Sequence, residues 1–445
     1  MALTSLRALP VWQKARQVSE EPTPLDFYCE DRCGHNAVCI KEELLVWGGY
    51  HERSIGSMYC EKKILWSFNL DLDSWYRVTT YGKGPEFRSG ACSALIWPRW
   101  YIMCGHTYDG DVNDVHALNL ITLRWEKIQV PTRGVKAIAP RDKATAWAHE
   151  NSRIYIFGGY GMKPYAFMWS GEEDKYTLEV EFGRGWNDQI VYLDVEKKCW
   201  VRPQCQGPKP KSRAAHATIY VEGDVYLFGG RHQSERMNDL HRFNVESHRW
   251  SGTLCCLGTL PEGRTWHTLS RASKTDLLMY GGFNVEQKPL DDAWLLNMET
   301  LSWSVLSRST GFPRLWHTAS TNPHGDVLIF GGCENNILDE ETSMITSRKV
   351  LLLRTKPFSL ERLCLHCMYT QRSVLRPQWE CLPRQFQEWL QAKEKVSEEM
   401  KPPISMSNVV LGQGPSLSQL SIVTKSEAQG LNDDQDFANY LFHAF

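Results

Sequence analysis

The 445-residue sequence has little net charge and no long apolar run. A formal charge of -2 gives no electrostatic footprint for nucleic acid or an anionic membrane surface. No apolar run reaches the ~18 residues that a membrane-spanning helix needs. Residues 1–17 lack the apolar core of a secretion signal. We therefore expect an intracellular soluble protein of the nucleus, the cytoplasm or both, with no nucleic-acid or membrane partner.

The sequence also lacks common signatures of catalysis. It has no Gly-x-Ser-x-Gly, phosphate-binding loop or paired-carboxylate motif, so we expect no enzymatic activity and no cofactor. Fourteen cysteines without a secretion signal are expected to be reduced thiols, mostly packed as small hydrophobes. Cys364-Leu365-His366-Cys367 resembles half of a zinc site. No second ligand pair of matching spacing follows, which favours packed thiols and no metal.

A run of about four apolar residues that stops at a glycine-containing pair recurs six times. The pairs are Gly48-Gly49, Cys104-Gly105, Gly158-Gly159, Gly229-Gly230, Gly281-Gly282 and Gly331-Gly332. Such a run is typical of a buried strand that ends where the backbone needs conformations open to glycine. A period near fifty residues with this ending is the kelch signature of a β-propeller. We predict an all-β, six-bladed propeller with four strands per blade and a tryptophan on the outer strand.

Arginine and histidine recur at fixed places before these pairs. An arginine lies 16 or 17 residues before the first position of each pair: Arg32, Arg88, Arg141, Arg213, Arg264 and Arg314. In four repeats a histidine follows three residues later: His35, His216, His267 and His317. Metal or base chemistry is the functional alternative. Recurrence favours structure, because a catalytic group occurs once and not once per blade. We expect each side chain to tether its own blade through backbone hydrogen bonds.

The repeat ends near Lys356, and this divides the chain into four parts. They are an N-terminal segment at 1–28, the propeller at 29–357, a helical segment at 358–392, and a mostly disordered tail at 393–445 that is rich in Glu and Lys and then in Pro, Ser and Gly. The sixth repeat has no tryptophan-marked outer strand, so we expect the stretch from Pro24 to Tyr28 to close the ring. An insertion of roughly twenty residues between Gly161 and Trp186 should overhang the face from which the pairs emerge.

The residue after each pair is expected at the mouth of the central channel. These residues are Tyr50, His106, Tyr160, Arg231, Phe283 and Cys333. Arg231 is the permanent cation of the set, and Arg236 can reach the same place. Two arginines beside aromatic walls suit a carboxylate or phosphate, because the guanidinium fork matches two oxygens. The alternative is two solvated arginines offset by Glu235 and Asp239.

Two amphipathic stretches follow the propeller. Ser359 can cap the first helix, and Pro383 suits the first position of the second. The residues that share one helix face are Leu360, Cys364 and Met368 in the first stretch, and Leu382, Phe386 and Leu390 in the second. Either helix alone more commonly just covers the propeller's flank.

Together these stretches resemble a known adaptor module. Ser-Leu-x-x-x-Cys-x-x-x-apolar is similar to the BC box, which binds Elongin C, and Leu-Pro-x-x-Phe-x-x-x-Leu is similar to the Cullin-2 box. The resemblance implies Elongin B/C and Cullin-2 with its RING subunit as partners. It assigns Leu360, Cys364 and Met368 to Elongin C, and Leu382, Pro383, Phe386 and Leu390 to Cullin-2.

From roughly Cys29 to Leu390 the chain also resembles the kelch domain-containing protein 1 and 2 family, most closely in Arg231–His241, Arg264–His267 and Arg314–His317. That resemblance implies a substrate receptor that binds protein C-termini ending in Gly-Gly and delivers them for ubiquitylation. It implies Arg231, Arg236 and Thr265 as carboxylate ligands, with Tyr160, Lys143, Trp186 and Trp266 as pocket walls. We add Tyr50 to the expected walls because it follows a glycine pair. Threonine at 265 replaces the family's serine, and Cys104 replaces a glycine.

Two other functional classes stay open. A plain kelch scaffold for protein–protein interaction would keep the propeller but would have no use for the two helical motifs. An oxidase-like metalloenzyme would need a copper-binding set of Tyr, Cys and His that the sequence does not supply. Co-purification of Elongin B/C distinguishes the first class from a ligase receptor, and metal analysis tests the second.

Overall fold

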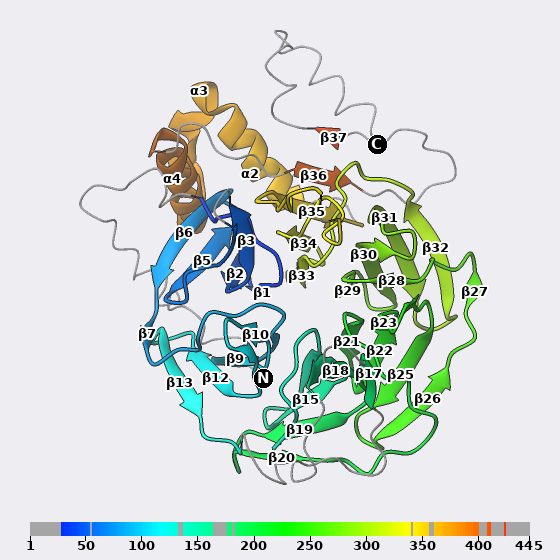
Figure 1. Cartoon of the computed structure of the whole chain (residues 1–445). Helices are drawn as coiled ribbons and strands as arrows, with labels where there is room; N and C mark the ends of the chain where they lie inside the picture. The colour runs from blue at the N-terminus through cyan, green and yellow to red at the C-terminus, as the bar shows by residue number, and fades with distance from the viewer. Residues whose placement is uncertain are drawn as a thin grey trace.

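The computed structural model describes residues 28–53, 56–131, 137–162, 176–179, 183–339, 341–355, 360–399, 407–410 and 422–423. Within these residues, six sheets of at least four strands stand as blades around a central channel (Figure 1). This arrangement confirms the all-β, six-bladed propeller with a short helical segment after it. No helix of the described ranges is long and apolar enough to span a membrane.

Blades one to three follow the chain from the channel to the rim. Blade one contains β1 (Asn36–Ile40), β2 (Glu43–Trp47), β5 (Ile64–Asn69) and β6 (Ser74–Thr79). Blade two contains β8 (Cys92–Ile96), β9 (Arg99–Met103), β12 (Val115–Asn119) and β13 (Arg124–Ile128), with β7 (Tyr81–Gly82) at its outer edge. Blade three contains β14 (Thr145–His149), β15 (Arg153–Phe157), β19 (Ile190–Asp194) and β20 (Cys199–Val201).

Blades four to six complete the circle. Blade four contains β21 (Ala217–Val221), β22 (Asp224–Phe228), β25 (Leu240–Asn244) and β26 (Arg249–Thr253). Blade five contains β29 (Thr268–Arg271), β30 (Asp276–Asn284), β31 (Pro289–Asn297) and β32 (Ser302–Ser307), with β28 (Arg264–Thr265) and β27 (Leu257–Gly258) at its edges. Blade six contains β33 (Thr318–Thr321), β34 (Val327–Phe330), β35 (Val350–Arg354), β36 (Ser407–Val410) and β37 (Ile422–Val423).

The core lies in the seams between neighbouring blades. Phe228 of β22 packs against Trp303 on the outer strand of the next blade, with ring centroids 5.1 Å apart. Phe157 meets Trp250 in the same way at 5.0 Å. The last apolar residue before a glycine pair therefore packs on the tryptophan of the following blade, which explains why both marks recur with one period.

The repeated arginines are buried and hold the glycine pairs. In five blades the arginine Nη1 donates to the carbonyl oxygen of the first residue of its own pair, at 2.9–3.0 Å: Arg32, Arg88, Arg141, Arg213 and Arg264. Arg314 differs, because its Nη1 donates to the Pro313 carbonyl and pairs with Glu334. The structural interpretation of the arginines is confirmed for these five blades.

The expectation for the histidines is wrong in one respect, because they tether the neighbouring blade rather than their own. The ring Nε2 lies 2.8–3.0 Å from a threonine Oγ1 in the preceding blade in three pairs: His35 with Thr318, His216 with Thr145, and His317 with Thr268. Each threonine lies four residues after its blade's arginine. Blade four has Ala217 at that position, and neither ring nitrogen of His267 finds a partner in the described residues.

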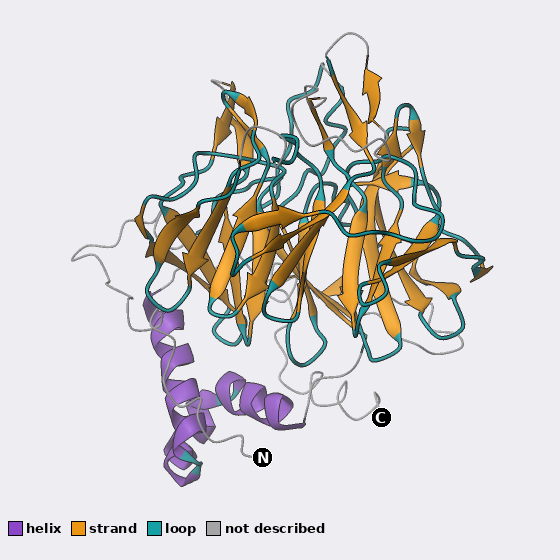
Figure 2. Ribbon diagram, turned by 90° about the horizontal axis from the view of Figure 1, so that it is seen from below, coloured by secondary structure: helices purple, strands orange, loops and turns teal. Residues whose placement is uncertain are grey.

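Four hairpin-like elements begin at the residue after a glycine pair and stand on one face of the propeller. They are β3 (Tyr50–Arg53) with β4 (Gly56–Tyr59), β10 (His106–Thr107) with β11 (Gly110–Asp111), β16 (Tyr160–Met162) with β18 (Arg184–Asn187) and β17 (Tyr176–Glu179), and β23 (Arg231–His232) with β24 (Glu235–Arg236). Strands rise above the body of the propeller on the side away from the helices (Figure 2). The three-stranded element belongs to the insertion, which confirms the expected overhang for its described residues.

The ring closes through the C-terminal part of the chain. Strand β36 runs parallel to β35, with Leu351 opposite Ser407, and supplies the fourth strand of blade six. We expected a strand from Pro24 to Tyr28; residues up to 27 lie outside the described ranges, and Tyr28 forms no strand. Ser407–Val410 also lies in the stretch expected to be mostly disordered. The segment that pairs with the open edge of β35 is Ser407–Val410. This segment has no tryptophan of the kind that marks the other outer strands, so the sequence did not point to it.

The helical segment lies against the face opposite the hairpins. It contains α2 (Leu360–Thr370), α3 (Arg372–Leu375), the 3-10 turn η2 (Arg376–Cys381) and α4 (Arg384–Glu399), which runs past the expected end at residue 392. Arg362 reaches Asp326 at 3.1 Å and Asp71 at 3.5 Å, both in turns of that face. Lys393 Nζ donates to the Asp71 carbonyl at 2.6 Å. The helices thus project from blades one and six (Figure 1), on the side away from the raised strands (Figure 2).

Candidate functional site

A closed circle of six backbone hydrogen bonds surrounds the channel. In each blade the residue two positions after the repeated arginine donates its N–H to the carbonyl of the equivalent residue in the preceding blade, at 2.8–3.2 Å. We call these six residues the mouth ring: Gly34, Gly90, Lys143, Ala215, Trp266 and Trp316. All six have φ between 53° and 62°. The left-handed backbone is costly for lysine or tryptophan, so the circle of hydrogen bonds must hold it in place.

The mouth ring is asymmetric because its side chains differ. Gly34 and Gly90 leave one side bare. Trp266 and Trp316 pack against each other on the opposite side, with centroids 5.6 Å apart and planes at 26°. Lys143 Nζ lies 5.2 Å from the Trp316 ring, within cation–π range. The ring therefore provides an aromatic, singly charged floor for whatever binds above it.

Two cavities open above this floor and share Lys143 and Trp316. The first, which we call the arginine cavity, has a volume of about 280 Å³. Its walls are Lys143, Tyr160, Glu179, Trp186, Ala214, Ala215, Arg231, Thr265, Trp266, Trp316, Ile337 and Leu338. Of the eight pocket residues expected from the sequence, six meet here: Arg231, Thr265, Tyr160, Lys143, Trp186 and Trp266.

Arg231 is anchored on one edge and weakly paired on the other. Its Nε donates to the Gln233 carbonyl at 2.6 Å, and its guanidinium lies 5.5 Å from the Trp186 ring. Its Nη2 is 3.8 Å from a Glu179 carboxylate oxygen, longer than a hydrogen bond. Glu179 is itself held by the Tyr160 hydroxyl, which donates to it. An incoming carboxylate would therefore find Arg231 already oriented, with Glu179 at 3.8 Å as its competing anionic partner.

Arg236 lies beside Arg231, its partner across the β23–β24 pair. Its guanidinium stands 4.8 Å from the Phe283 ring. Burial and the charge of Arg231 both lower its pKa. Within the part of the chain that the structure describes, its buried Nε has no hydrogen-bond partner. A half-buried cation with an unsatisfied donor would gain from an added anion.

Thr265 completes this wall. Its side chain is buried, and its hydroxyl lies 3.4 Å from the Phe283 carbonyl, a long hydrogen bond. The strand pair that places it, Arg264–Thr265 against Phe283–Asn284, makes Thr265 a wall residue of the arginine cavity together with Arg231. The hydroxyl can exchange its weak contact for a bond to a ligand oxygen at little cost.

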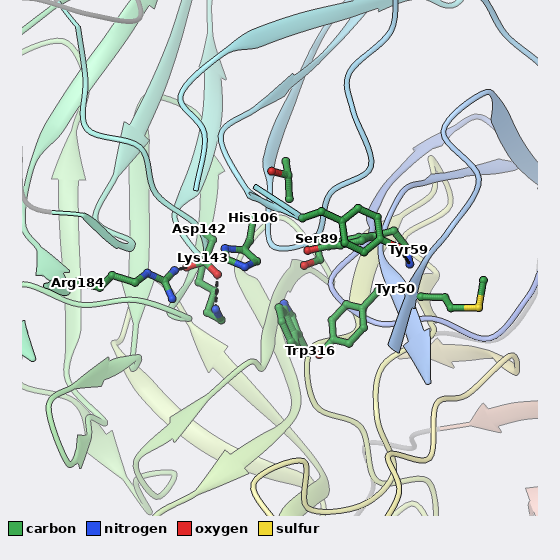
Figure 3. A pocket seen from close by; sticks show the side chains of 11 residues that line it. Tyr50, Tyr59, Ser89, His106, Asp142, Lys143, Arg184 and Trp316 are labelled. Atoms are coloured by element: carbon green, nitrogen blue, oxygen red, sulfur yellow. Dashed lines mark hydrogen bonds and ion pairs between the residues drawn. The ribbon is translucent and has the colours of Figure 1, made fainter. Parts of the chain in front are cut away.

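The second cavity, which we call the tyrosine cavity, has a volume of about 430 Å³ (Figure 3). Its walls are Tyr50, Met58, Tyr59, Ser89, His106, Thr107, Tyr108, Asp142, Lys143, Arg184 and Trp316. Tyr50, expected beside the arginines, lies here and contacts Trp316 edge-on at 5.5 Å. The two cavities therefore form one two-lobed depression across the channel mouth.

The residues that directly follow the glycine pairs do not all reach the mouth. Tyr160 and Arg231 line the arginine cavity, and Tyr50 and His106 line the tyrosine cavity. Phe283 and Cys333 are fully buried. The expectation of a six-membered ring of such residues is therefore wrong for these two, because they pack with Cys33 and Leu315 in one buried apolar cluster.

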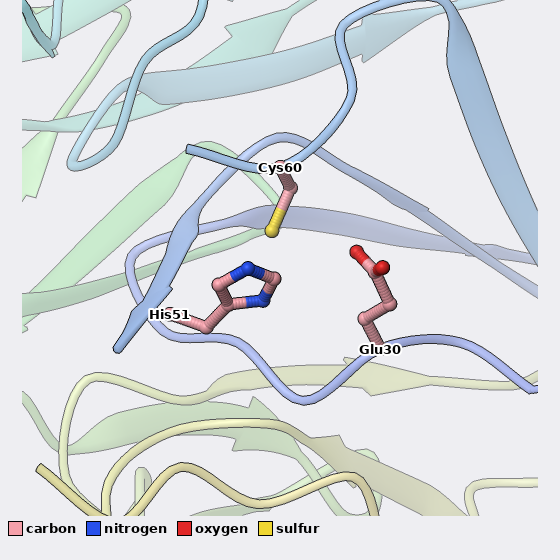
Figure 4. Close-up of side chains that lie close together, drawn as sticks. All are labelled: Glu30, His51 and Cys60. Carbon is pink, nitrogen blue, oxygen red and sulfur yellow. The ribbon is translucent and has the colours of Figure 1, made fainter. Parts of the chain in front are cut away.

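One of the side-chain clusters whose spacing could suit a metal lies at the start of the propeller. Glu30, His51 and Cys60 have ligand atoms within 4.8 Å of one another (Figure 4). The buried Arg32 guanidinium lies 4.0 Å from Glu30 and supplies a positive charge there. Burial raises the pKa of Cys60 to about 11, which keeps the thiol protonated. These neighbours favour a reduced, metal-free cluster.

The helical segment presents apolar side chains to solvent. No residue of α2 is buried; Leu360 is 75% exposed, Cys364 is exposed and Met368 is partly exposed. In the second set Pro383 is exposed, Leu382 and Phe386 are half-buried, and Leu390 is completely buried. Leu390 thus packs inside the segment, and Ser359 lies outside the described residues.

Comparison with known proteins agrees with this architecture. The profile of the KLHDC2/KLHL20/DRC7 Kelch-repeats domain matches residues 11–175 and 166–332. The chain belongs to this kelch-repeat family. Kelch domain-containing protein 2 of Bos taurus is 35% identical over 372 residues, which cover 80% of this chain and 88% of that protein. Kelch domain-containing protein 1 of Mus musculus is 33% identical over 366 residues with the same coverage, and kelch domain-containing protein 10 of Homo sapiens is 25% identical over 322 residues, covering 68% and 66%.

Sequence reasoning missed many wall residues of the two cavities, among them Glu179, Arg184 and Trp316. Glu179 and Arg184 belong to the insertion, whose course has no periodic signal. Trp316 was noted only in the family resemblance, yet it separates the two cavities. A signal for Trp316 was present: it stands two residues after the repeated arginine, where blade five also has a tryptophan and the other four blades have glycine, alanine or lysine.

Proposed function

We propose that the protein is the substrate-recognition subunit of a Cullin-2/Elongin B/C ubiquitin ligase and binds protein C-termini that end in Gly-Gly. The observation that carries the binding of such C-termini is the pair Arg231 and Arg236 beside an aromatic floor. One of these arginines has an unsatisfied buried donor, and the other has its nearest carboxylate at 3.8 Å. Such a pair suits a free terminal carboxylate.

Selectivity for glycine follows from the walls. Trp266, Trp316 and Trp186 leave about 280 Å³, which is shared with the Arg231 side chain; Arg236 stands opposite Arg231 on the neighbouring strand and is not among the wall residues. A terminal Gly-Gly has no Cβ, so its backbone can approach these rings more closely than that of any other pair. Each charge-assisted contact to the carboxylate stabilises the complex by ~1.5–3 kcal/mol. An internal Gly-Gly has no carboxylate and leaves both arginines unpaired, which penalises the wrong ligand.

A one-residue extension tests the requirement for a terminal pair. We expect a labelled peptide ending in Gly-Gly to bind the full chain, and the same peptide with one added alanine to bind at least ~100-fold more weakly, because the carboxylate moves away from the arginines. Fluorescence anisotropy measures both affinities. Equal affinities would show that the site reads something other than the chain end.

The helical segment supports the ligase half of the proposal. A helix that only covers the propeller would bury its apolar face, whereas no residue of α2 is buried and Leu360 is largely exposed. Leu360, Cys364 and Met368 can therefore contact a partner such as Elongin C. On this account the chain performs no chemistry, and ubiquitin transfer belongs to its partners.

Co-purification tests this half separately. Leu360→Glu places a charge on the exposed face of α2 and should abolish capture of Elongin B/C. Leu257→Glu is the matched control, because Leu257 is 64% exposed on blade five, far along the chain from the helices. Capture of Elongin B/C that survives Leu360→Glu, or that neither variant nor wild type shows, would favour a scaffold without a ligase.

A further inference from the structure

The proposed function assigns no role to most walls of the tyrosine cavity, yet this cavity directly adjoins the arginine cavity. It shares Lys143 and Trp316 with the arginine cavity, and it is the larger of the two. A bound peptide must leave the arginine cavity somewhere. An extended chain advances about 3.3 Å per residue, so side chains within about four residues before the terminal pair can reach the adjoining lobe.

Aromatic edges and faces dominate one side of this cavity. Tyr50 stands between Trp316 and Tyr59, with ring centroids 5.5 and 6.2 Å away. Tyr59 meets Tyr108 edge-on at 4.6 Å, and the Tyr59 N–H lies 3.4 Å from the Tyr108 hydroxyl. Met58 adds an exposed thioether. Figure 3 shows Tyr50, Tyr59 and Trp316 on the side of the cavity away from Arg184, a surface onto which an apolar or aromatic side chain can stack.

The other side of the cavity carries ion pairs. In these pairs the basic side chains are partly exposed and the carboxylates are buried. Arg184 forms two bonds to Asp111, at 2.7 and 2.9 Å, and Lys143 is paired with Asp142. His106 Nδ1 also lies 2.9 Å from Asp111. The two carboxylates are 1–3% exposed, whereas Arg184 and Lys143 remain 26% and 21% exposed. A basic ligand side chain would therefore meet positive charge and find both carboxylates already occupied.

We propose that the tyrosine cavity binds a large apolar or aromatic side chain that lies within about four residues upstream of the terminal Gly-Gly, and that it disfavours lysine and arginine there. The substrate class would then be C-termini with an apolar or aromatic residue shortly before the glycine pair. This inference rests on the proposed function. The volume of about 430 Å³ accommodates the largest side chains.

The test uses the full chain and peptides of one length that end in Gly-Gly with serine elsewhere. Each of the four upstream positions carries Phe, Leu, Lys, Glu or Ala in turn, and anisotropy gives the dissociation constants. At one position Phe or Leu should bind about tenfold more tightly than Ala, and Lys should bind more weakly than Ala. Equal affinities across all residues at all four positions would overturn the inference while leaving the terminal-pair proposal intact. If no Gly-Gly peptide binds, both fall together.

A double-mutant cycle locates the effect in the cavity. Tyr59→Ala combined with Phe→Ala in the peptide should show a coupling of at least about fivefold, because each change removes the same ring contact. Tyr81→Ala is the control: Tyr81 is exposed on the outer edge of blade two and should show no coupling. Additive effects for Tyr59→Ala, or equal coupling for Tyr81→Ala, would contradict the assignment.

Discussion

The buried seams and the channel mouth of this propeller use the same repeat in opposite ways. In the seams every blade carries an arginine, and five of the six make the same bond to a glycine-pair carbonyl. Two residues later, in the mouth ring, the blades carry glycine twice, lysine, alanine and tryptophan twice. The backbone circle is identical in all six blades, but its side chains are not. Repetition builds the scaffold, and the departures from repetition create the site.

The largest effect is expected in the seam. Arg264→Ala removes a fully buried guanidinium that binds Asp292 at 2.7 and 2.9 Å and the Gly281 carbonyl at 3.0 Å. The abandoned carboxylate should lower the free energy of unfolding by ~3–5 kcal/mol. Urea unfolding measures it. Arg231→Ala at the mouth is the comparison, and an equal loss for both variants would erase the distinction between seam and mouth.

At the channel mouth, a substitution should weaken binding and leave stability nearly unchanged. Arg231→Ala is expected to weaken binding of a Gly-Gly peptide by ~2–5 kcal/mol and to leave unfolding nearly unchanged, because Arg231 is partly exposed and weakly paired. Arg249→Ala is the matched control, an exposed arginine on the outer strand of the same blade. Retained affinity in Arg231→Ala, measured by calorimetry, would remove this arginine from the site.

Acid should act on the seams. Burial lowers the pKa of His216 and of His317 to about 3, with the nearby Arg213 and Arg314 adding to the effect. The unfolded chain protonates these rings near pH 6.5 whereas the folded chain does not, so stability falls as the pH drops from about 6.5 to 3. Each ring contributes up to ~1.4 kcal/mol per pH unit.

Unfolding at pH 7.5 and 5.5 tests this sign. His317→Gln keeps a polar group near Thr268 and should make the loss on acidification smaller than in wild type. An unchanged pH dependence would show that the histidines do not carry the acid sensitivity.

The smallest expected effect is a gain in stability from adding the missing threonine hydroxyl at the seam that contains His267. His267 has no hydrogen-bond partner in the described residues, and Ala217 stands where three other blades have threonine. Ala217→Thr should supply the missing hydroxyl and raise the unfolding free energy by ~0.5–1.5 kcal/mol. Ala217→Val, which has the same shape without the hydroxyl, is the control. Equal stability of the two variants would mean that no bond forms.

The features that recur from blade to blade could be predicted from the sequence. Glycine pairs, arginines and outer tryptophans gave the blade number and the arginine bonds, because each recurs with the period of the strands. The partner of each histidine could not be predicted, because it lies one blade away, about fifty residues distant in sequence. The closing strand Ser407–Val410 was missed for the same reason, since it follows a helical segment and no mark links it to β35.

At the site, eight pocket residues were predicted, and six of them meet in one cavity. The residues that these six contact were not predicted. Glu179, which faces Arg231, and Arg184, which covers two carboxylates, come from the insertion, where no period guides an assignment. Tyr50 was placed beside the arginines because it follows a glycine pair, yet it lies in the adjoining lobe. Equivalence along the repeat fixes backbone position, and side-chain direction then depends on neighbours from other blades.

The central claim is that the mouth binds a free terminal carboxylate through Arg231 and Arg236. The most direct test compares two peptides that differ only at the end, one with a free Gly-Gly acid and one with a C-terminal amide. The acid should bind, and the amide should lose at least ~100-fold in affinity, because it has no charge to satisfy the two guanidinium groups. Equal binding of acid and amide would contradict the account.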